Sequence, residues 1–334
     1  MIENIFRHAK KILPFIGIVI LLYLIFTSDI EKITDNFWKI FSNPIFFVIA
    51  LSLLLPRVLV RNYAWQFILK EQKIQIGFWK SLKIFLIGFF YCSVTPGYVG
   101  HVMRIPYLKE ATNEPYGKLF VNTIVELVIR SFSNNWIITM GLVFLLAALP
   151  GYGNIMFIWI AYIVISLSLL IYLIKRERGE KLLLFLIRLP IPIYKRYRTS
   201  FEKFVATFYN DFPRVRILIL PFLLGIITWV IGFAQEYMFV LALELPIPFL
   251  EFMLLFSIAN VVGFLPITFA GLGTREYTAT FIFTSLYATV SQEEILLVSL
   301  LGFFVVDVFT GLVGFVLSLI DARENPIKEM PLKY

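Results

Sequence analysis

The sequence predicts an all-α polytopic membrane protein with about 7–9 membrane segments. Of its 334 residues, 59% are hydrophobic and only 16% are charged, and the mean hydropathy is +0.84. A soluble domain of this length has too little interior to hide so much apolar surface, so the bilayer must be the solvent. The apolar runs extend over ~17–28 residues, which suits membrane helices and exceeds the ~10-residue alternating strands of a membrane barrel.

The apolar runs predict the helices in chain order. They lie near 12–28, 44–69, 78–95, 116–149, 153–174, 215–243, 249–267, 272–290 and 293–320. The first run lacks a small-residue cleavage site, which indicates a retained span and not a signal peptide. The run 116–149 is too long for one simple span, so it is either a tilted helix or two pieces broken near Ser133-Asn134-Asn135.

The positions of Lys and Arg predict the orientation in the cell membrane. Positive residues concentrate in 1–11, in 70–83, in 175–216 and after Ile320. By the positive-inside rule these segments, including both termini, face the cytoplasm. The basic segment 175–214 is then an amphipathic cytoplasmic linker. The connections expected outside are 29–43, 150–154, 243–251 and 290–294, of which 29–43 carries Lys32 and Lys39 and is placed there by alternation alone.

A Gly/Pro-broken, charge-bearing segment occurs twice. The copies run from Thr95 to Arg104 and from Pro266 to Glu276, with Gly100 and Gly273 separated by 173 residues. The sides predicted for the flanking segments require 84–110 to enter the membrane from the cytoplasm and return to it. They require 251–290 to enter from the outside and return to that side. We therefore predict one integral membrane domain with two inverted repeats, 44–149 and 215–320, each containing a re-entrant hairpin.

Several ionisable residues lie within the predicted spans, where charges are costly and usually face a cavity or a partner. Glu126 and Arg130 are four residues apart on one helix face, so we expect them to neutralise each other. Arg57 and Arg61 also share a face but have no acid in their span. Across the halves, a central network with the acids Glu236 and Asp307 would satisfy them.

The second broken segment predicts an anion-binding site. Arg275 and Glu276 follow Gly271 and Gly273, where a helix can begin. Helix N-terminal N–H groups together with a guanidinium suit a phosphate, and the glycines let a bulky headgroup approach the backbone. The substrate-binding candidates are Arg275, Glu276, Gly271, Gly273, Arg104, Gly97, Gly100 and Arg57, with His101 as a further counterpart in the first segment.

Other chemistries lack their residues in this sequence. Cys92 is the one cysteine, and the two histidines, His8 and His101, are too few for a histidine-rich metal site. No Walker loop is present. We expect no metal, no cofactor and no enzymatic activity. The net charge of +8 is concentrated in the linker, so we expect membrane lipid as the partner and no nucleic acid.

These motifs resemble a known family. The run from Ser257 to Pro266, followed by Ala270-Gly271-Leu272-Gly273-Thr274-Arg275-Glu276, is similar to the signature of the flippase-like transmembrane domain of lysylphosphatidylglycerol synthases (multiple peptide resistance factors). The first segment resembles that family's P-x-x-x-G-E-x-x-R, with His101 in place of the Glu, and Glu126 resembles the glutamate of its next helix. The resemblance extends over about 12–320, in the manner of a stand-alone member without the synthase domain, so lysyl transfer is not expected.

The resemblance implies translocation of a phospholipid or polyprenyl-phosphate-linked lipid between leaflets. The favoured hypothesis is a flippase-like transporter without ATPase activity. One alternative is an intramembrane lipid or glycosyl transferase using Glu236, Glu276 or Asp307. Another is a membrane scaffold for a separate lipid-modifying enzyme, in which 176–213 forms the contact surface. A homo-oligomer is compatible with each hypothesis.

Overall fold

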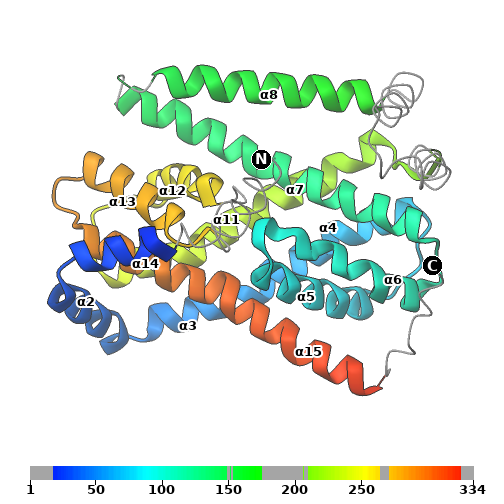
Figure 1. Cartoon of the computed structure of the whole chain (residues 1–334), viewed down its shortest axis with the longest axis horizontal. Helices are drawn as coiled ribbons and strands as arrows, with labels where there is room; N and C mark the ends of the chain where they lie inside the picture. The colour runs from blue at the N-terminus through cyan, green and yellow to red at the C-terminus, as the bar shows by residue number, and fades with distance from the viewer. Residues whose placement is uncertain are drawn as a thin grey trace, which may run out of the picture.

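In the computed structural model, every element of the described residues is a helix; these residues are 18–148, 151, 153–174, 206, 210–263 and 271–324 (Figure 1). Four helices are long and apolar enough to cross a bilayer: Ile45–Glu71, Tyr116–Ala148, Val215–Ala242 and Gln292–Ala322. Shorter apolar helices cover Ile18–Thr27, Phe157–Ser168 and Phe249–Val262. The chain is therefore an all-helical membrane protein, and the total of 7–9 segments stays a prediction.

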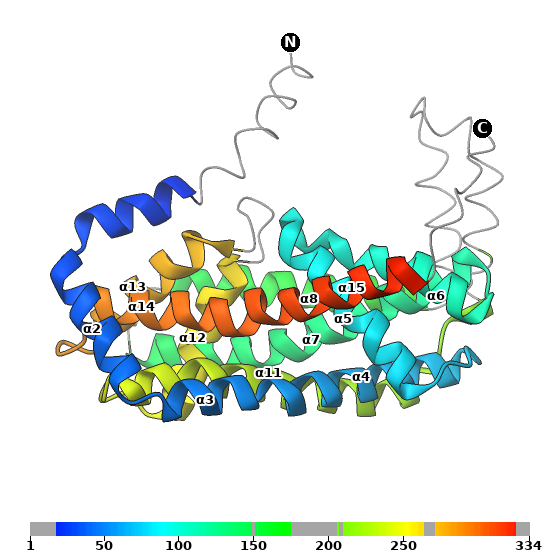
Figure 2. The same ribbon diagram turned by 90° about the horizontal axis from the view of Figure 1, so that it is seen from below.

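A central pair of helices joins the two halves of the chain. Helix α3 (Ile45–Ser52) leads into α4 (Leu54–Glu71), which packs along α11 (Ile219–Ala242). Pro56 lies in the first turn of α4, where a missing N–H costs no helical hydrogen bond. Figure 2 shows α3, α4 and α11 together in one layer. Arg57 and Arg61 lie on α4, and Glu236 lies on α11.

The remaining long helices pack across the halves in a reciprocal way. Helix α5 (Phe78–Val94) packs against α15 (Thr310–Glu324), whereas α12 (Phe249–Gly263) packs against α7 (Tyr116–Ala148). Both contacts depend on a glycine: a Cβ at Gly141 would overlap the Leu254 carbonyl oxygen, and a Cβ at Gly314 would overlap that of Leu86. Glycine allows the two backbones of each pair to approach this closely.

The first broken segment folds back on the helix before it. Helix α5 ends at Val94 and is followed by η1 (Pro96–Met103) and α6 (Arg104–Thr112), both of which pack against α5. The Thr95 hydroxyl donates to the Tyr91 carbonyl at 2.7 Å and accepts from the Gly100 N–H at 2.9 Å. This residue therefore closes the turn and starts the return of the chain.

The second broken segment also leads into a helix that returns along its predecessor. Residues 264–270, which include Pro266, lie outside the described residues. Helix α13 (Thr274–Leu286) begins after Gly271 and Gly273, whose φ angles of 79° and 86° suit glycine alone among common residues. The Glu276 carboxylate accepts from the Gly273 N–H at 2.6 Å, and α13 packs on α12. The start of α13 is thus fixed from within the motif.

The second half of the chain holds the larger apolar core. Phe239, Phe252, Phe256 and Phe283 are fully buried there and come from α11, α12 and α13. Helix α8 (Gly153–Ile174) runs beside α7, where the Trp159 indole donates to the Thr139 hydroxyl at 3.1 Å. Figure 1 shows α8 along one edge of the molecule. Of the predicted basic linker 175–214, only 206 and 210–214 belong to the described residues.

The structure corrects two expectations about individual segments and decides between the two alternatives for a third. The connection 29–43 is not a loop but contains α2 (Ile30–Ser42), with Asp29 as its N-cap. The run 116–149 is not broken near Ser133–Asn135, because α7 is one continuous helix. The last run is less regular than expected: α14 (Gln292–Phe303) passes through a π-helical segment, η5 (Phe304–Phe309), before α15.

Candidate functional site

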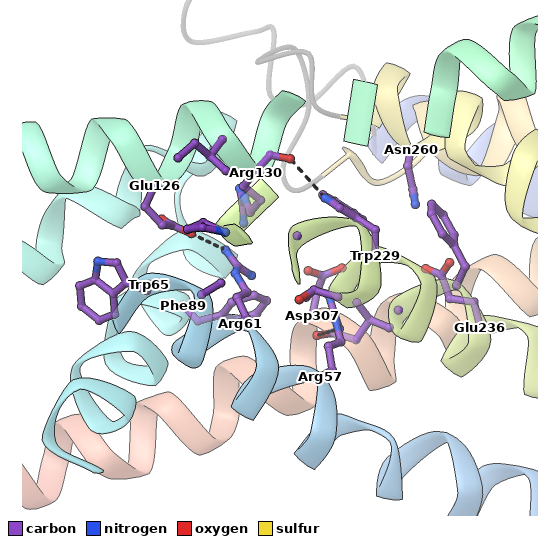
Figure 3. A pocket seen from close by; sticks show the side chains of 18 of the residues that line it. Arg57, Arg61, Trp65, Phe89, Glu126, Arg130, Trp229, Glu236, Asn260 and Asp307 are labelled. Carbon is purple, nitrogen blue, oxygen red and sulfur yellow. Dashed lines mark hydrogen bonds and ion pairs between the residues drawn. The ribbon is translucent and has the colours of Figure 1, made fainter. Parts of the chain in front are cut away.

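A pocket lies between the central helix pair and the helices that cross it. Its cavity has a volume of about 80 Å³, which is room for several water molecules or a small polar group. Figure 3 shows side chains converging on it from α4, α7, α11, α12 and η5. Its charged lining consists of Arg57, Arg61, Arg130, Arg275, Glu126, Glu236 and Asp307.

A buried ion-pair cluster forms the first end of the pocket. The Arg104 Nη2 atom donates to the Glu126 Oε2 atom at 2.6 Å, and both side chains are buried. The Arg61 Nη2 atom lies 3.8 Å from the other Glu126 oxygen. Arg61 also lies over the ring of Phe85 at 4.7 Å, and Arg104 over that of Trp65 at 4.9 Å. Aromatic faces thus supplement a single carboxylate that serves two guanidinium groups.

This cluster corrects the expected pairing of Glu126 with Arg130. Within the described residues, the ion-pair partners of Glu126 are Arg104 and Arg61. Arg130 lines the pocket one helical turn away, and its backbone carbonyl accepts from the Trp229 indole at 3.3 Å (Figure 3). Arg104 reaches the acid because Gly88 leaves space for its side chain: a Cβ at Gly88 would overlap it.

A second buried cluster forms around Arg275. Its guanidinium donates to the Glu276 carboxylate at 2.7 Å, to the Ser299 carbonyl at 3.0 Å and to the Ser299 hydroxyl at 3.2 Å. The Asp307 carboxylate lies 4.0 Å from Arg275 Nη1. Arg275 is only 4% exposed, so most of its donors already serve the protein. Its role as a substrate ligand stays a prediction.

Arg57 lies between the two clusters. Its Nη1 atom donates to the Gln235 side chain at 3.2 Å and to the Val306 carbonyl at 3.4 Å. Gln235 in turn donates to the Ala50 carbonyl at 2.9 Å. In Figure 3, Arg57 and Asp307 occupy the middle of the pocket, with Glu126 toward one end and Glu236 toward the other. The charged residues predicted to form a central network therefore do surround one cavity.

The first segment contributes less to the pocket than predicted. Gly97 and Gly100 belong to η1, and a Cβ at Gly100 would overlap the Tyr91 and Cys92 backbone, so Gly100 serves packing within the hairpin. His101 is 1% exposed, and neither of its ring nitrogens has a hydrogen-bond partner among the described residues. Arg104 contacts two lining residues of the pocket, Glu126 and Trp65.

The pocket carries more positive than negative side chains. Four arginines and three carboxylates line it, which gives a formal excess of one positive charge when all are ionised. The excess lies toward the Arg61 end, where the Nε and Nη2 atoms lack hydrogen-bond partners among the described residues. Buried donors without partners are costly, so this end suits an anionic group that accepts several hydrogen bonds.

Several lining residues did not emerge from the sequence analysis. Trp229 and Asn260 line the pocket, and Ser299 holds Arg275. Ser299 follows Glu126 by 173 residues, the same offset that separates Gly100 from Gly273. Glu126 contacts Arg104 of the first broken segment, and Ser299 contacts Arg275 of the second. Applying the repeat offset to Glu126 would have identified Ser299, whereas no local signal marks Trp229.

The sequence model of one protein family, described as the lysylphosphatidylglycerol synthase TM region, matches residues 15–314. A search of curated proteins finds no match. The family match includes both broken segments, the central helix pair and all the charged residues of the pocket. The chain therefore belongs to this family.

Proposed function

We propose that this member of the lysylphosphatidylglycerol synthase TM-region family is a flippase-like transporter, which moves an anionic phospholipid or polyprenyl-phosphate-linked lipid between leaflets. The observation that carries the proposal is the arginine-rich pocket, in which Arg57, Arg61 and Arg130 line one cavity. Guanidinium groups bind phosphate oxygens through strong, directional hydrogen bonds. Acyl or isoprenyl chains would stay in the surrounding bilayer while the headgroup crosses through the pocket.

The proposal includes an inverted-repeat architecture, which the reciprocal packing supports. Gly314 follows Gly141 by 173 residues, and each glycine admits the carbonyl of the helix from the opposite half. Helix α13 has 13 residues and spans roughly 20 Å at about 1.5 Å per residue, which is less than the ~30 Å hydrocarbon core. A helix of this length fits a re-entrant hairpin better than a full crossing.

The acids of the site favour transport over chemistry on the lipid. Glu276 is occupied by Arg275, Ser299 and the Gly273 N–H, and Glu126 is occupied by two arginines. A general acid or base needs a position from which it can reach the reacting group. We therefore propose that Glu126 and Glu276 organise the pocket and do not act on the lipid.

The test is headgroup translocation in proteoliposomes that contain a fluorescent phosphatidylglycerol. A membrane-impermeant reductant bleaches the outer leaflet, and the rate of the slow phase reports translocation. We expect faster bleaching than in empty liposomes. The double variant Arg57→Gln/Arg130→Gln should slow it by about tenfold or more, since each hydrogen bond to a charged group contributes about 1.5–3 kcal/mol.

Lys39→Gln is the control, because it removes a positive charge outside the pocket, at an exposed ion pair with Glu244. It should bleach at the wild-type rate. Wild-type protein that bleaches no faster than empty liposomes would overturn transport of this lipid class. A double variant as fast as wild type would overturn the assignment of the arginines.

A further inference from the structure

Glu236 differs from the other acids of the pocket because its carboxyl group has no hydrogen-bond or ion-pair partner among the described residues. Its side chain is buried, at 3% residue exposure, and lines the pocket. The Oε2 atom has no hydrogen-bond partner, and no ion pair within 4.0 Å joins Glu236 to any described residue. By contrast, Glu126 and Glu276 each accept hydrogen bonds from a guanidinium.

The surrounding helices fix Glu236 in this position. Gly302 of α14 packs against its side-chain stem: a Cβ there would come within 2.7 Å of the Glu236 Cγ atom. The carboxyl group therefore points along the pocket and not into a polar contact. Figure 3 shows it at the end of the pocket opposite Glu126, near Asn260. The pocket therefore holds a buried carboxyl group that forms no ion pair with the described arginines nearby.

The charged groups that face Glu236 come from three elements. They are Arg57 on α4, Arg275 and Glu276 on α13, and Asp307 on η5. Arg275 is committed to Glu276, Ser299 and Asp307, and Arg57 to Gln235 and the Val306 carbonyl. Helix α7 contributes Arg130 and Glu126 to the same pocket, α3 carries no ionisable residue, and Glu293 and Glu294 of α14 lie at the far N-terminal end of that helix.

A buried carboxylate without a hydrogen bond or ion pair is costly, whereas the neutral acid is tolerated. A phosphate in the same pocket makes the ionised form costlier still, because two negative charges would then share the arginines. Binding of the anion and binding of a proton by Glu236 must therefore favour each other, and linkage makes this coupling reciprocal.

From this arrangement we infer that Glu236 is the proton-binding site of the transporter and that one proton accompanies each anionic headgroup through the pocket. The inference rests on the proposed function. The carboxylate takes up a proton when the headgroup enters, and the neutral carboxylic acid returns that proton to water when the headgroup leaves. No bond of the lipid is made or broken.

The experiment measures the affinity of full-length protein in detergent for dihexanoyl-phosphatidylglycerol from about pH 5 to about pH 9, a range that brackets the titration of a perturbed carboxyl group. This lipid is a phosphodiester and keeps one negative charge throughout. Wild-type affinity should fall as the pH rises, approaching tenfold per pH unit once Glu236 is ionised in the free protein, because one proton is then taken up per anion bound. Glu236→Gln mimics the neutral acid and should bind at every pH with the affinity that wild type shows at the acidic end.

Two further variants keep the result interpretable. Glu244→Gln removes a carboxylate from an exposed position just beyond the same helix, and it should keep the wild-type pH dependence. Asp307→Asn tests the neighbouring acid. Proton uptake on binding, followed with an indicator in weakly buffered solution, should be about one per anion in wild type and absent in Glu236→Gln.

The inference is overturned if Glu236→Gln retains the wild-type pH dependence, or if Asp307→Asn is the variant that removes it. It is also overturned if Glu236→Gln binds weakly at every pH, since Glu236 would then be accepting a hydrogen bond from the lipid itself. The proposed function fails separately, when wild type does not bind the anionic lipid at any pH or when Arg57→Gln/Arg130→Gln binds it unchanged.

Discussion

Single side chains define two unlike ends of the pocket. At one end, Glu126 holds Arg104 and Arg61, and a part of the Arg61 guanidinium remains without partners among the described residues. At the other end, the Oε2 atom of Glu236 has no hydrogen-bond partner among the described residues. The two ends therefore offer a ligand opposite chemistry within one cavity: unpartnered donors at one and an unpartnered carboxyl oxygen at the other.

Replacement of Glu126 by Gln should destabilise the fold. The change leaves Arg104, which is fully buried, without its carboxylate, and breaking one partner of a buried pair costs about 3–5 kcal/mol. Thermal unfolding in detergent measures this loss. Glu126→Gln combined with Arg104→Gln should recover part of it, because only Arg61 of the two guanidinium groups that share the carboxylate then remains charged. An unchanged melting temperature for the single variant would show that the pair does not stabilise the protein.

The sequence analysis singled out Glu126 and Arg104 but gave Glu126 the wrong partner. An i,i+4 neighbour on one helix is visible in the sequence, whereas the true partner lies on an element 22 residues earlier. The pairing depends on the hairpin of α5, η1 and α6, which returns Arg104 to the face of α7. No local pattern carries that information.

At the scale of elements, the crossing contacts of α5 with α15 and of α12 with α7 carry the architecture. Each depends on a glycine that admits a carbonyl group. A side chain at either position must push two helices apart, and one helix of each pair, α5 or α12, borders a broken segment.

Gly141→Val and Gly314→Val should each destabilise the protein by about 1–3 kcal/mol, the usual cost of overpacking a close contact. The two effects should be similar, because the positions are equivalent under the 173-residue offset. Thermal unfolding in detergent is the measurement. Gly77→Ala is the control, since a Cβ there would meet nothing within 4 Å. A large loss for one glycine with none for the other would count against the repeat.

The sequence predicted most long helices within a few residues but missed α2. Its residues alternate between apolar and charged with helical spacing, and Lys32 and Lys39 made the segment look like a loop. Ile40 of this helix is fully buried, and Lys39 pairs with Glu244 at 2.8 Å. A short amphipathic helix gains its stability from tertiary packing, which a hydropathy average does not detect.

At the scale of the molecule, the orientation in the membrane follows from loop charges and stays a prediction. Lys73 lies in a segment rich in Lys, and Glu244 lies in a connection without Lys or Arg. Because positive residues stay in the cytoplasm, these two positions should lie on opposite sides of the bilayer.

Single cysteines at these positions test the orientation in intact cells. In a Cys92→Ser background, Glu244→Cys should react with an impermeant maleimide from outside, and Lys73→Cys should react only after the cells are opened. Cys92 itself is buried, at 1% exposure, so the parent protein should label poorly and serves as the control. Labelling of both positions from the same side would contradict the predicted topology.

The reciprocal packing also determines which parts of the protein can move together. Because α5 packs against α15 and α12 packs against α7, neither half of the sequence forms an independent structural unit. Each half packs one of its helices against a helix of the other half. Any rigid body that rotates relative to the α4–α11 pair must therefore contain helices from both halves of the chain. If the linker between the halves were cut, each of the two fragments would still need the other to bury its apolar helix faces.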